Sequence, residues 1–153
     1  MTATDVLVDE LERTRDEVLR YFSLGVADLS RTYGPGKWSV RYLLHHLTDS
    51  EVVLMERLRR VISERNMVVW YYDQDSWSKA LDYSTRSLEA SKPVFESLRN
   101  AIIVDARRHY ERDGAIEFVH SKAGLRTLKE EYEKVASHTA HHLRQVRQAL
   151  AGH

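Results

Sequence analysis

The sequence contains no cysteine, and only two prolines and six glycines occur among its 153 residues. The absence of cysteine excludes disulfides, thiolate metal sites and a cysteine nucleophile. The scarcity of proline and glycine, together with 42% hydrophobic and 30% charged residues, favours long helices over many short strands and turns. The length predicts a single domain over residues 1–153, large enough to bury a core without disulfides.

A net charge and a long apolar run are also missing. The 23 basic and 23 acidic side chains cancel, so no net field attracts the chain to nucleic acid or to an anionic membrane. No apolar run reaches the ~18–20 residues that span a bilayer, and the N-terminal segment is acidic and amphipathic, unlike a secretory signal. We therefore expect a cytoplasmic protein with neither a nucleic-acid nor a membrane partner.

Four stretches carry apolar residues at three- and four-residue spacing, which is the pattern of a helix with one buried face. They cover approximately residues 4–28, 39–65, 78–108 and 126–150. Ser39 is a good N-cap for the second stretch, and no strand pattern lies between the four. The sequence therefore predicts an all-α fold, an antiparallel four-helix bundle, in which side chains on facing helices build any cofactor site.

Two segments interrupt this pattern. Pro93 lies within the third predicted helix, so it either kinks that helix or marks a restart with Ser91 as N-cap. Residues 68–77 are rich in aromatic side chains and aspartate, too irregular for a long helix and too apolar for a solvated linker. We expect this segment to pack over one end of the bundle.

The histidines of the last predicted helix have an informative spacing. His138 and His142 are four residues apart, so their side chains point nearly the same way and lie about 6 Å apart, within reach of one metal ion. At about 100° per residue, His142 lies roughly 40° from the apolar centre of the helix, His138 roughly 80° and His141 roughly 140°. The pattern selects His138 and His142 and leaves His141 on the rim or outside. Three further histidines carry no pattern: His109, His120 and His153.

The second predicted helix offers two adjacent histidines as a third ligand. His46 lies roughly 110° from the centre of the apolar face, and His45 lies roughly 150° away on the opposite side. Periodicity therefore favours His46 only modestly. We expect His45, like His141, to be exposed or to support a ligand.

Two carboxylates follow this histidine pair. Glu51 falls within the apolar face, where a carboxylate needs a cation, a metal or a donor. We favour a structural partner for it, either Lys37, Arg57 or a backbone donor, over a role as ligand or general base. Asp49 lies one helical turn from the histidine pair, and two interpretations stay open: it orients an imidazole, or it is a solvated charge.

Three neutral imidazoles on a rigid bundle leave coordination positions open for water or substrate, as in catalytic rather than structural metal sites. An ion held in this way lowers the pKa of a bound water or thiol and polarises an electrophile. Imidazole suits zinc, nickel, iron and copper, so the ligand type does not choose among these metals.

Several short motifs occur in a characteristic order and separation: GKWSV at 36–40, HLTDSE at 46–51, YDQDSW at 72–77, GLRTL at 124–128, and His138 and His142 followed by Gln145. Over nearly the whole chain this arrangement resembles the DinB-like superfamily of metal-binding four-helix bundles. The resemblance implies that the histidine before the L-x-D-x-E motif and the two late histidines bind the ion. These positions correspond to His46, His138 and His142.

The resemblance also implies further properties. Relatives include bacillithiol S-transferases and mycothiol-dependent maleylpyruvate isomerases, so it implies a low-molecular-weight thiol as a candidate nucleophile. It further implies a homodimer and an up-down-down-up order of helices, which a long connection between the second and third helices permits. Zinc and nickel are the leading metals, followed by iron.

Two classes of function follow from these observations. The first is a metal-dependent enzyme, a thiol S-transferase or hydrolase, that acts on a small electrophilic molecule; Asp49 and Glu51 would then be supporting residues. The second is a non-catalytic module, either a metal-binding stress-response protein or a bundle whose dimer interface is its function. An exposed apolar face around Val6, Leu7 and Val8 would support the second class.

Overall fold

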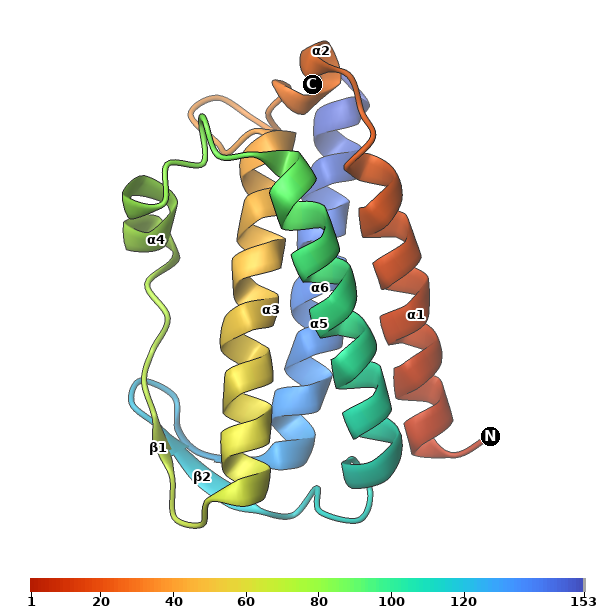
Figure 1. Ribbon diagram of the computed structural model, residues 1–153, viewed down its shortest axis with the longest axis vertical. Helices are drawn as coiled ribbons and strands as arrows, with labels where there is room; N and C mark the ends of the chain where they lie inside the picture. Colours follow the sequence, from red (N-terminus) through yellow and green to blue (C-terminus); the bar gives the residue numbers. More distant parts are fainter. Residues whose placement is uncertain (153) are drawn as a thin grey trace.

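The computed structural model describes residues 1–152 and consists mainly of four long helices (Figure 1). These are α1 (Ala3–Tyr21), α3 (Val40–Ser63), α5 (Leu88–His109) and α6 (Leu128–Leu150). In Figure 1 they run up, down, down and up, so both the predicted four-helix bundle and its helix order are confirmed. Helix α3 packs against α5 and α6, and α1 packs against the same two helices. Among the described residues, no helix is both long and apolar enough to cross a membrane.

Hydroxyl side chains define where the long helices begin. Thr2 forms a capping box with Asp5 at the start of α1, and Thr127 forms another with Glu130 at the start of α6. The Ser39 hydroxyl accepts a hydrogen bond from a backbone N–H in the first turn of α3, as predicted. Such caps satisfy backbone donors that have no partner within the helix, and each stabilises its helix by about 1 kcal/mol.

Two predicted helix boundaries are wrong. The first long helix ends at Tyr21 instead of extending to residue 28, and a separate short helix, α2 (Val26–Leu29), follows with Gly25 as its N-cap. Tight three-residue hydrogen bonds at Ser23 and Leu24 close the end of α1 before this glycine. A glycine inside a helix costs about 1 kcal/mol, so the break falls beside it.

The helix expected from residue 78 is two helices. Helix α4 (Gln74–Ala80) ends in a turn in which Asp82 has a φ of 44°, and α5 begins only at Leu88. The N-cap of α5 is Ser87, whose hydroxyl accepts a hydrogen bond from the Ala90 N–H, and not Ser91. Pro93 lies inside α5.

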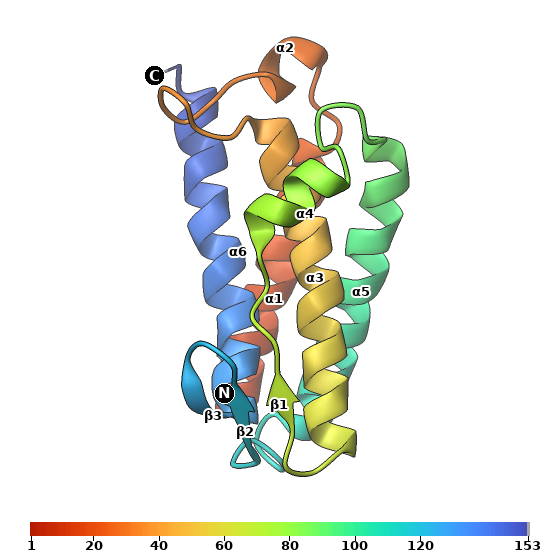
Figure 2. The same ribbon diagram turned by 90° about the vertical axis from the view of Figure 1, so that its left-hand side faces the viewer.

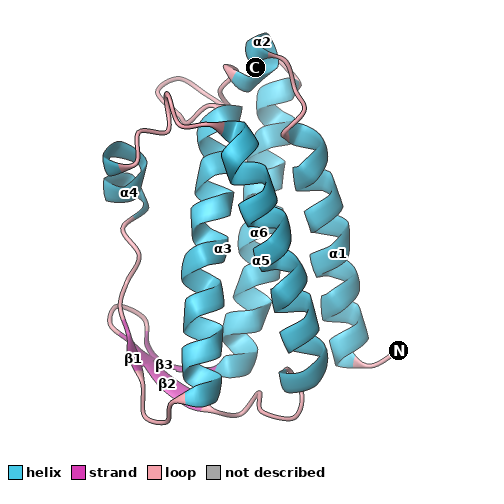
Figure 3. Ribbon diagram, in the orientation of Figure 1, coloured by secondary structure: helices cyan, strands magenta, loops and turns pink. Residues whose placement is uncertain are grey.

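The structure also contains short strands, for which the sequence shows no pattern. A small sheet lies at one end of the bundle, made of β1 (Val68–Val69), β2 (Glu117–His120) and β3 (Gly124–Thr127) (Figure 3). Strand β1 pairs with β2 in parallel, and β2 pairs with β3 antiparallel. Strands of two to four residues are too short to produce a recognisable alternation of apolar residues, so sequence periodicity does not reveal them.

The aromatic segment does not cover an end of the bundle, contrary to our expectation. From β1 to α4 it runs along the side of the bundle, in front of α3 and α6 (Figure 2). Its first residues are held by pairing with β2, and α4 contacts α3 near the other end. The segment therefore covers the line along which α3 and α6 meet.

The core has a polar layer between two apolar ones. One apolar cluster contains Leu11, Leu54 and Ile102, and the other contains Val18, Leu47 and Phe95, each with further buried side chains. Between them lies a layer to which each long helix contributes a buried polar residue: Thr14 from α1, Glu51 from α3, Arg99 from α5 and Thr139 from α6.

Candidate metal centre

Three histidine side chains meet where α3 and α6 face each other. His46 comes from α3, and His138 and His142 come from successive turns of α6. The Nε2 atom of His46 lies 3.0 Å from those of His138 and His142, which are 3.1 Å from each other. His46 and His142 are buried and His138 is partly buried. The structure thus brings together the three residues expected from the sequence.

Gln145 fixes the orientation of one of these rings. Its Oε1 atom lies 2.6 Å from Nδ1 of His142, so Nδ1 carries the proton and donates it to the amide oxygen. The Nε2 atom of His142 then presents its lone pair to the other two rings. Residues that hold the far nitrogen of a ligating histidine fix its tautomer and raise its basicity.

The three imidazoles are neutral near pH 7. Burial lowers the pKa of His46 to about 2, that of His138 to about 3 and that of His142 to about 4. For His46 and His138, repulsion from neighbouring rings of the cluster lowers the pKa further. A neutral imidazole is the form that binds a metal ion.

The donor set fits one divalent cation. Imidazole nitrogens on a tetrahedral zinc ion, each at ~2.0–2.1 Å, are about 3.3 Å apart, close to the spacing of the three Nε2 atoms. When all three Nε2 atoms carry lone pairs, as Nε2 of His142 does, these lone pairs repel one another at this spacing, and a cation between them removes that repulsion. The residues present would therefore hold a metal ion with open coordination positions.

Aromatic side chains enclose the cluster. The Tyr72 ring stacks on His46, with ring centroids 6.0 Å apart and planes 2° from parallel, and Trp77 packs edge-on against Tyr72. On another side Trp38 lies 5.2 Å from the His46 ring. Tyr72 and Trp77 belong to the segment that runs along α3 and α6, so this segment forms a wall of the site.

Two pockets flank the histidines. We call the first, of about 190 Å³, the inner pocket; it is lined by Ser50, Val53, Leu54, Arg57, Tyr71, Tyr72, Gln74, His120, Lys134 and His138. We call the second, of about 250 Å³, the outer pocket; it is lined by Tyr33, Gly36, Lys37, Trp38, Gln74, Asp75, His141, His142 and Gln145. Each pocket reaches one α6 histidine of the cluster, His138 in the inner pocket and His142 in the outer one, so a small molecule has access to the cluster from two sides.

The two acidic candidates have other partners. The Glu51 carboxylate pairs with Arg99, at 3.0 Å to Nε and 2.5 Å to an Nη atom, and not with Lys37 or Arg57 as expected. The expectation of a structural partner for Glu51 is thus confirmed, but the partner is a different residue. Residue spacing along α3 cannot identify a partner such as Arg99, which lies on α5.

Asp49 agrees with neither of its two interpretations. It is buried, and it accepts hydrogen bonds from the Tyr83 hydroxyl at 2.5 Å and from Arg86 at 2.8 Å. Within the described residues, no hydrogen bond joins Asp49 or Glu51 to a histidine.

The remaining histidines divide into separate environments. His45 is buried, not exposed, and its ring nitrogens lie 3.0 Å from the Ser91 hydroxyl and 3.1 Å from the Arg86 carbonyl. His141 is exposed at the rim of the outer pocket, as the helical projection indicated. His109 pairs with Asp113, and His153 lies outside the described residues.

Sequence reasoning missed three residues beside the site: Tyr72, His120 and Lys134. For Lys134 a signal was present, because it precedes His138 by four residues as His138 precedes His142. Tyr72 and His120 lie on an irregular segment and a four-residue strand, where no periodicity indicates the direction of a side chain.

Known proteins resemble this chain in sequence. The model of the DinB superfamily matches residues 10–146. A protein of Oceanobacillus iheyensis, provisionally named a metal-dependent hydrolase, is 30% identical over 129 residues, which cover 84% of this chain and 74% of that protein. A protein of Halalkalibacterium halodurans with the same provisional name is 31% identical, with the same two coverages.

A solved structure resembles the chain in fold. It is YfiT from Bacillus subtilis, described as a probable metal-dependent hydrolase with an unusual four-helix bundle topology. The superposition has a TM-score of 0.87 and covers 97% of this chain and 87% of YfiT, at 21% sequence identity. At that identity the likeness concerns the fold.

Proposed function

This chain belongs to the DinB superfamily, and from that premise we propose that it is a divalent-metal-dependent hydrolase of a small electrophilic molecule, with His46, His138 and His142 as metal ligands. The observation that carries the proposal is the convergence of three neutral Nε2 atoms, 3.0 to 3.1 Å apart, between two pockets. The provisional names of the two sequence relatives support hydrolysis.

The ion and the protein supply different parts of the chemistry. A divalent ion lowers the pKa of a water that it binds and polarises an electrophilic carbonyl. The protein orients one ligand through Gln145 and shields the cluster from solvent with Trp38 and Tyr72. Zinc and nickel are the metals that we propose first, and iron follows them, because imidazole suits all three.

Tyr72 has a hydroxyl group that suits hydrogen-bond donation beside the cluster. The hydroxyl is buried, and it has no hydrogen-bond partner within the described residues. Burial raises the pKa of Tyr72 to about 12, so the group keeps its proton at neutral pH. A protonated hydroxyl at the inner pocket can donate to an oxygen of a bound substrate.

Metal content tests the ligand assignment. We expect the protein, purified without a histidine tag and supplied with zinc or nickel, to carry one ion per chain by elemental analysis. His142→Ala should lose this ion, because only two imidazoles would remain. His141→Ala is the matched control, since His141 is the exposed neighbour, and it should keep the ion. Absence of stoichiometric metal from the unmodified protein, or its full retention by His142→Ala, would contradict the assignment.

Rate measurements test the reaction class. With a panel of small esters and amides, we expect hydrolysis that depends on added metal and disappears in His142→Ala. A parallel panel combines cysteine or glutathione with monochlorobimane. A metal-dependent rate that requires a thiol would replace hydrolysis by thiol S-transfer, the other activity that the resemblance implies.

The non-catalytic alternative makes a different prediction about the surface. Of the three apolar residues considered near the N-terminus, Leu7 and Val8 are buried and Val6 is 57% exposed. Val6 lines a groove of about 530 Å³ between α1 and α6, together with Ala136 and Ala140. An apolar groove of this kind favours an interface with a second copy of the chain, so we propose a homodimer. We also propose a cytoplasmic location. Light scattering should show a dimer, and Val6→Glu should weaken its association. If the metal-loaded protein has no enzymatic activity, the result would favour the non-catalytic function.

A further inference from the structure

The inner pocket contains a lysine that the proposed metal chemistry does not use. Lys134 lies on α6 one helical turn before His138, and both side chains line the pocket. No hydrogen bond or ion pair engages the Lys134 ammonium group within the described residues, although the side chain is partly buried. Partial burial of an ammonium group without a carboxylate partner is costly unless an anion joins it.

The charged groups around Lys134 leave an excess of positive charge. Glu131 is fully buried, and its two oxygens lie 3.4 Å from Arg57 and 3.6 Å from Arg126. One carboxylate is therefore shared between two arginines, and Lys134 is a third cation. Burial lowers the pKa of Lys134, and Arg57 and Arg126 lower it further, against the attraction of Glu131. A bound anion would reverse this destabilisation of the ammonium group.

His120 adds a neutral hydrogen-bond donor to the inner pocket. The Nδ1 atom of His120 accepts hydrogen bonds from the backbone N–H groups of Lys122 and Ala123, both at 3.1 Å. Because Nδ1 is an acceptor, Nε2 carries the ring proton. His120 is 6% exposed and lines the inner pocket, and no hydrogen-bond partner for its Nε2 atom occurs in the part of the chain that the structure describes.

The other walls set the size and polarity of an occupant. Val53, Leu54 and the ring of Tyr71 are apolar surfaces of the pocket, and its volume is about 190 Å³. Pockets for drug-sized ligands measure ~300–1,000 Å³, so this one fits a smaller molecule. The combination of apolar walls with the donors of Lys134, His120 and Tyr72 matches a short organic anion.

We propose that the inner pocket binds the carboxylate of a short aliphatic substrate, with Lys134 as the ion-pair partner and His120 as a hydrogen-bond donor. The inference rests on the proposed function, because it places the electrophilic centre of that substrate toward His138 and the histidine cluster. It narrows the substrate class to small esters or amides that also carry a carboxylate.

A binding experiment with butyrate tests the proposal without requiring a known substrate. The full chain, in zinc-loaded and in EDTA-treated form, is titrated with butyrate, with its neutral isostere butyramide and with inorganic phosphate, and amide chemical shifts are followed by NMR. We expect saturable butyrate shifts at the amides of Leu54, His120 and Lys134 in both forms, with at least tenfold weaker binding of butyramide. Equal affinity for butyrate and butyramide, no binding of either, or tighter binding of phosphate would overturn the carboxylate assignment.

Two matched variants locate the interaction. Lys134→Met keeps most of the side-chain volume and removes the charge, so it should weaken butyrate binding at least tenfold. Lys129→Met changes a lysine of the same helix whose ammonium lies over the Tyr110 ring, outside the pocket, and should leave the affinity unchanged. Unchanged butyrate affinity in Lys134→Met would overturn the proposal.

Metal binding separates this proposal from the preceding one. Lys134→Met should retain one zinc ion per chain, whereas His142→Ala should lose zinc but still bind butyrate. If the unmodified protein binds butyrate but no metal, the metal proposal fails alone. If the unmodified protein binds metal but Lys134→Met leaves the butyrate affinity unchanged, only the carboxylate-pocket proposal fails.

Discussion

Two buried polar clusters lie side by side in this bundle, and they differ in how completely their hydrogen-bonding groups are paired. In the polar layer of the core, Arg99 donates to both oxygens of Glu51, to the Leu11 carbonyl at 3.1 Å, and to the hydroxyls of Thr14 at 3.0 Å and Thr139 at 2.7 Å. All five guanidinium N–H groups thus have an acceptor. The histidine cluster instead directs three nitrogen atoms at one another.

Of these two buried polar clusters, the histidine cluster is the one that needs an external partner. The Arg99 layer is complete, so it acts as structure and links all four long helices. The histidine cluster is incomplete by itself within the described residues, because three Nε2 atoms converge, only the Ser50 hydroxyl approaches them, at 3.4 Å from His46, and the buried Nδ1 of His46 has no hydrogen-bond partner. The incomplete cluster is therefore the candidate binding site.

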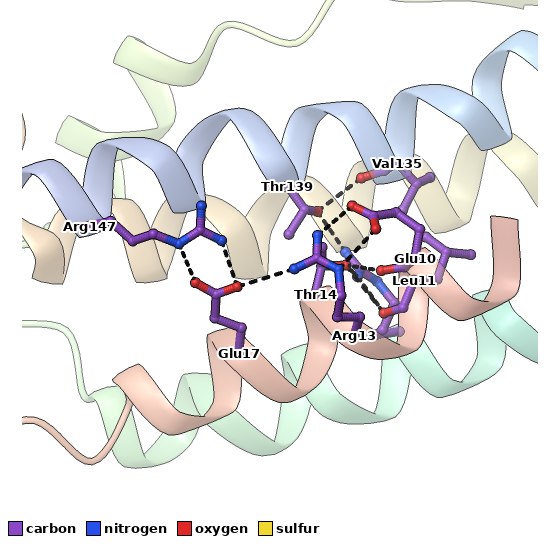
Figure 4. A network of polar contacts seen from close by, with 9 residues as sticks. Glu10, Leu11, Arg13, Thr14, Glu17, Val135, Thr139 and Arg147 are labelled. Carbon is purple, nitrogen blue, oxygen red and sulfur yellow. Dashed lines mark hydrogen bonds and ion pairs between the residues drawn. The ribbon is translucent and has the colours of Figure 1, made fainter. Parts of the chain in front are cut away.

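The complete cluster also supports the incomplete one. Thr139 lies between His138 and His142 in sequence, and its hydroxyl accepts a hydrogen bond from Arg99, which joins α6 to α5 beside the two histidines. Figure 4 shows Leu11 and Thr14 of α1 opposite Thr139 of α6, and nearby the pair of Glu17 with Arg147 joining the same two helices. Rigid support of this kind holds the histidine nitrogens at their spacing.

The largest effect should follow from breaking the complete cluster. Arg99→Met leaves the Glu51 carboxylate buried without a cation, and loss of one partner of a buried ion pair costs about 3–5 kcal/mol. Urea denaturation should show this decrease in the free energy of unfolding. Arg99→Met combined with Glu51→Leu should recover part of the loss, because the layer then contains no unpaired buried charge. A decrease below about 1 kcal/mol in Arg99→Met would show that the layer is not structural.

Acid should act on the incomplete cluster. The folded protein holds the pKa values of its three histidines at about 2, 3 and 4, below the value of 6.5 for an ordinary histidine. At a pH between the folded and the unfolded pKa values of these histidines, the unfolded chain binds more protons than the folded protein. The free energy of unfolding should therefore fall as pH decreases from 6.5 toward 4, by up to about 1.4 kcal/mol per pH unit for each histidine.

Urea midpoints at pH 7, 6 and 5 in EDTA measure this dependence. His142→Ala should reduce the slope by the contribution of one histidine. His45 adds a similar slope, since burial lowers its pKa to about 4. A stability that stays constant between pH 7 and 5 would contradict the burial of neutral imidazoles.

A smaller effect should follow from changing the partner of one ligand. Gln145→Leu removes the acceptor of the His142 Nδ1–H but keeps all three imidazoles. Loss of such a partner lowers metal affinity by about 10- to 100-fold. Competition with a chromophoric chelator measures the change, and the free energy of unfolding of the metal-free protein serves as the control. Unchanged affinity would show that packing alone, without the Gln145 hydrogen bond, orients the His142 ring.

The smallest effect belongs to an ion pair outside both clusters. Arg107 and Glu12 are 3.1 Å apart, and both side chains are largely exposed. Such pairs contribute about 0–1 kcal/mol. Arg107→Ala should therefore change the urea midpoint little, which makes it the surface control for Arg99→Met. A loss comparable to that of Arg99→Met would remove the distinction between buried and exposed pairs.

Sequence periodicity determined a large part of this structure. The four long helices, the Ser39 cap and the direction of His138, His142 and His141 follow from 3.6-residue geometry, because on one helix spacing alone fixes relative direction. The order of the motifs identified the family, and with it the helix order.

Tertiary structure decided which residues on different helices meet. It paired Glu51 with Arg99 and Asp49 with Arg86, and it turned His46 toward α6 while His45 faces Ser91 on α5. It also laid the aromatic segment along α3 and α6, which no helical period describes. The physical reason is that these contacts depend on the relative rotation of packed helices and on the path of irregular backbone, and neither is encoded in the spacing of residues along one helix.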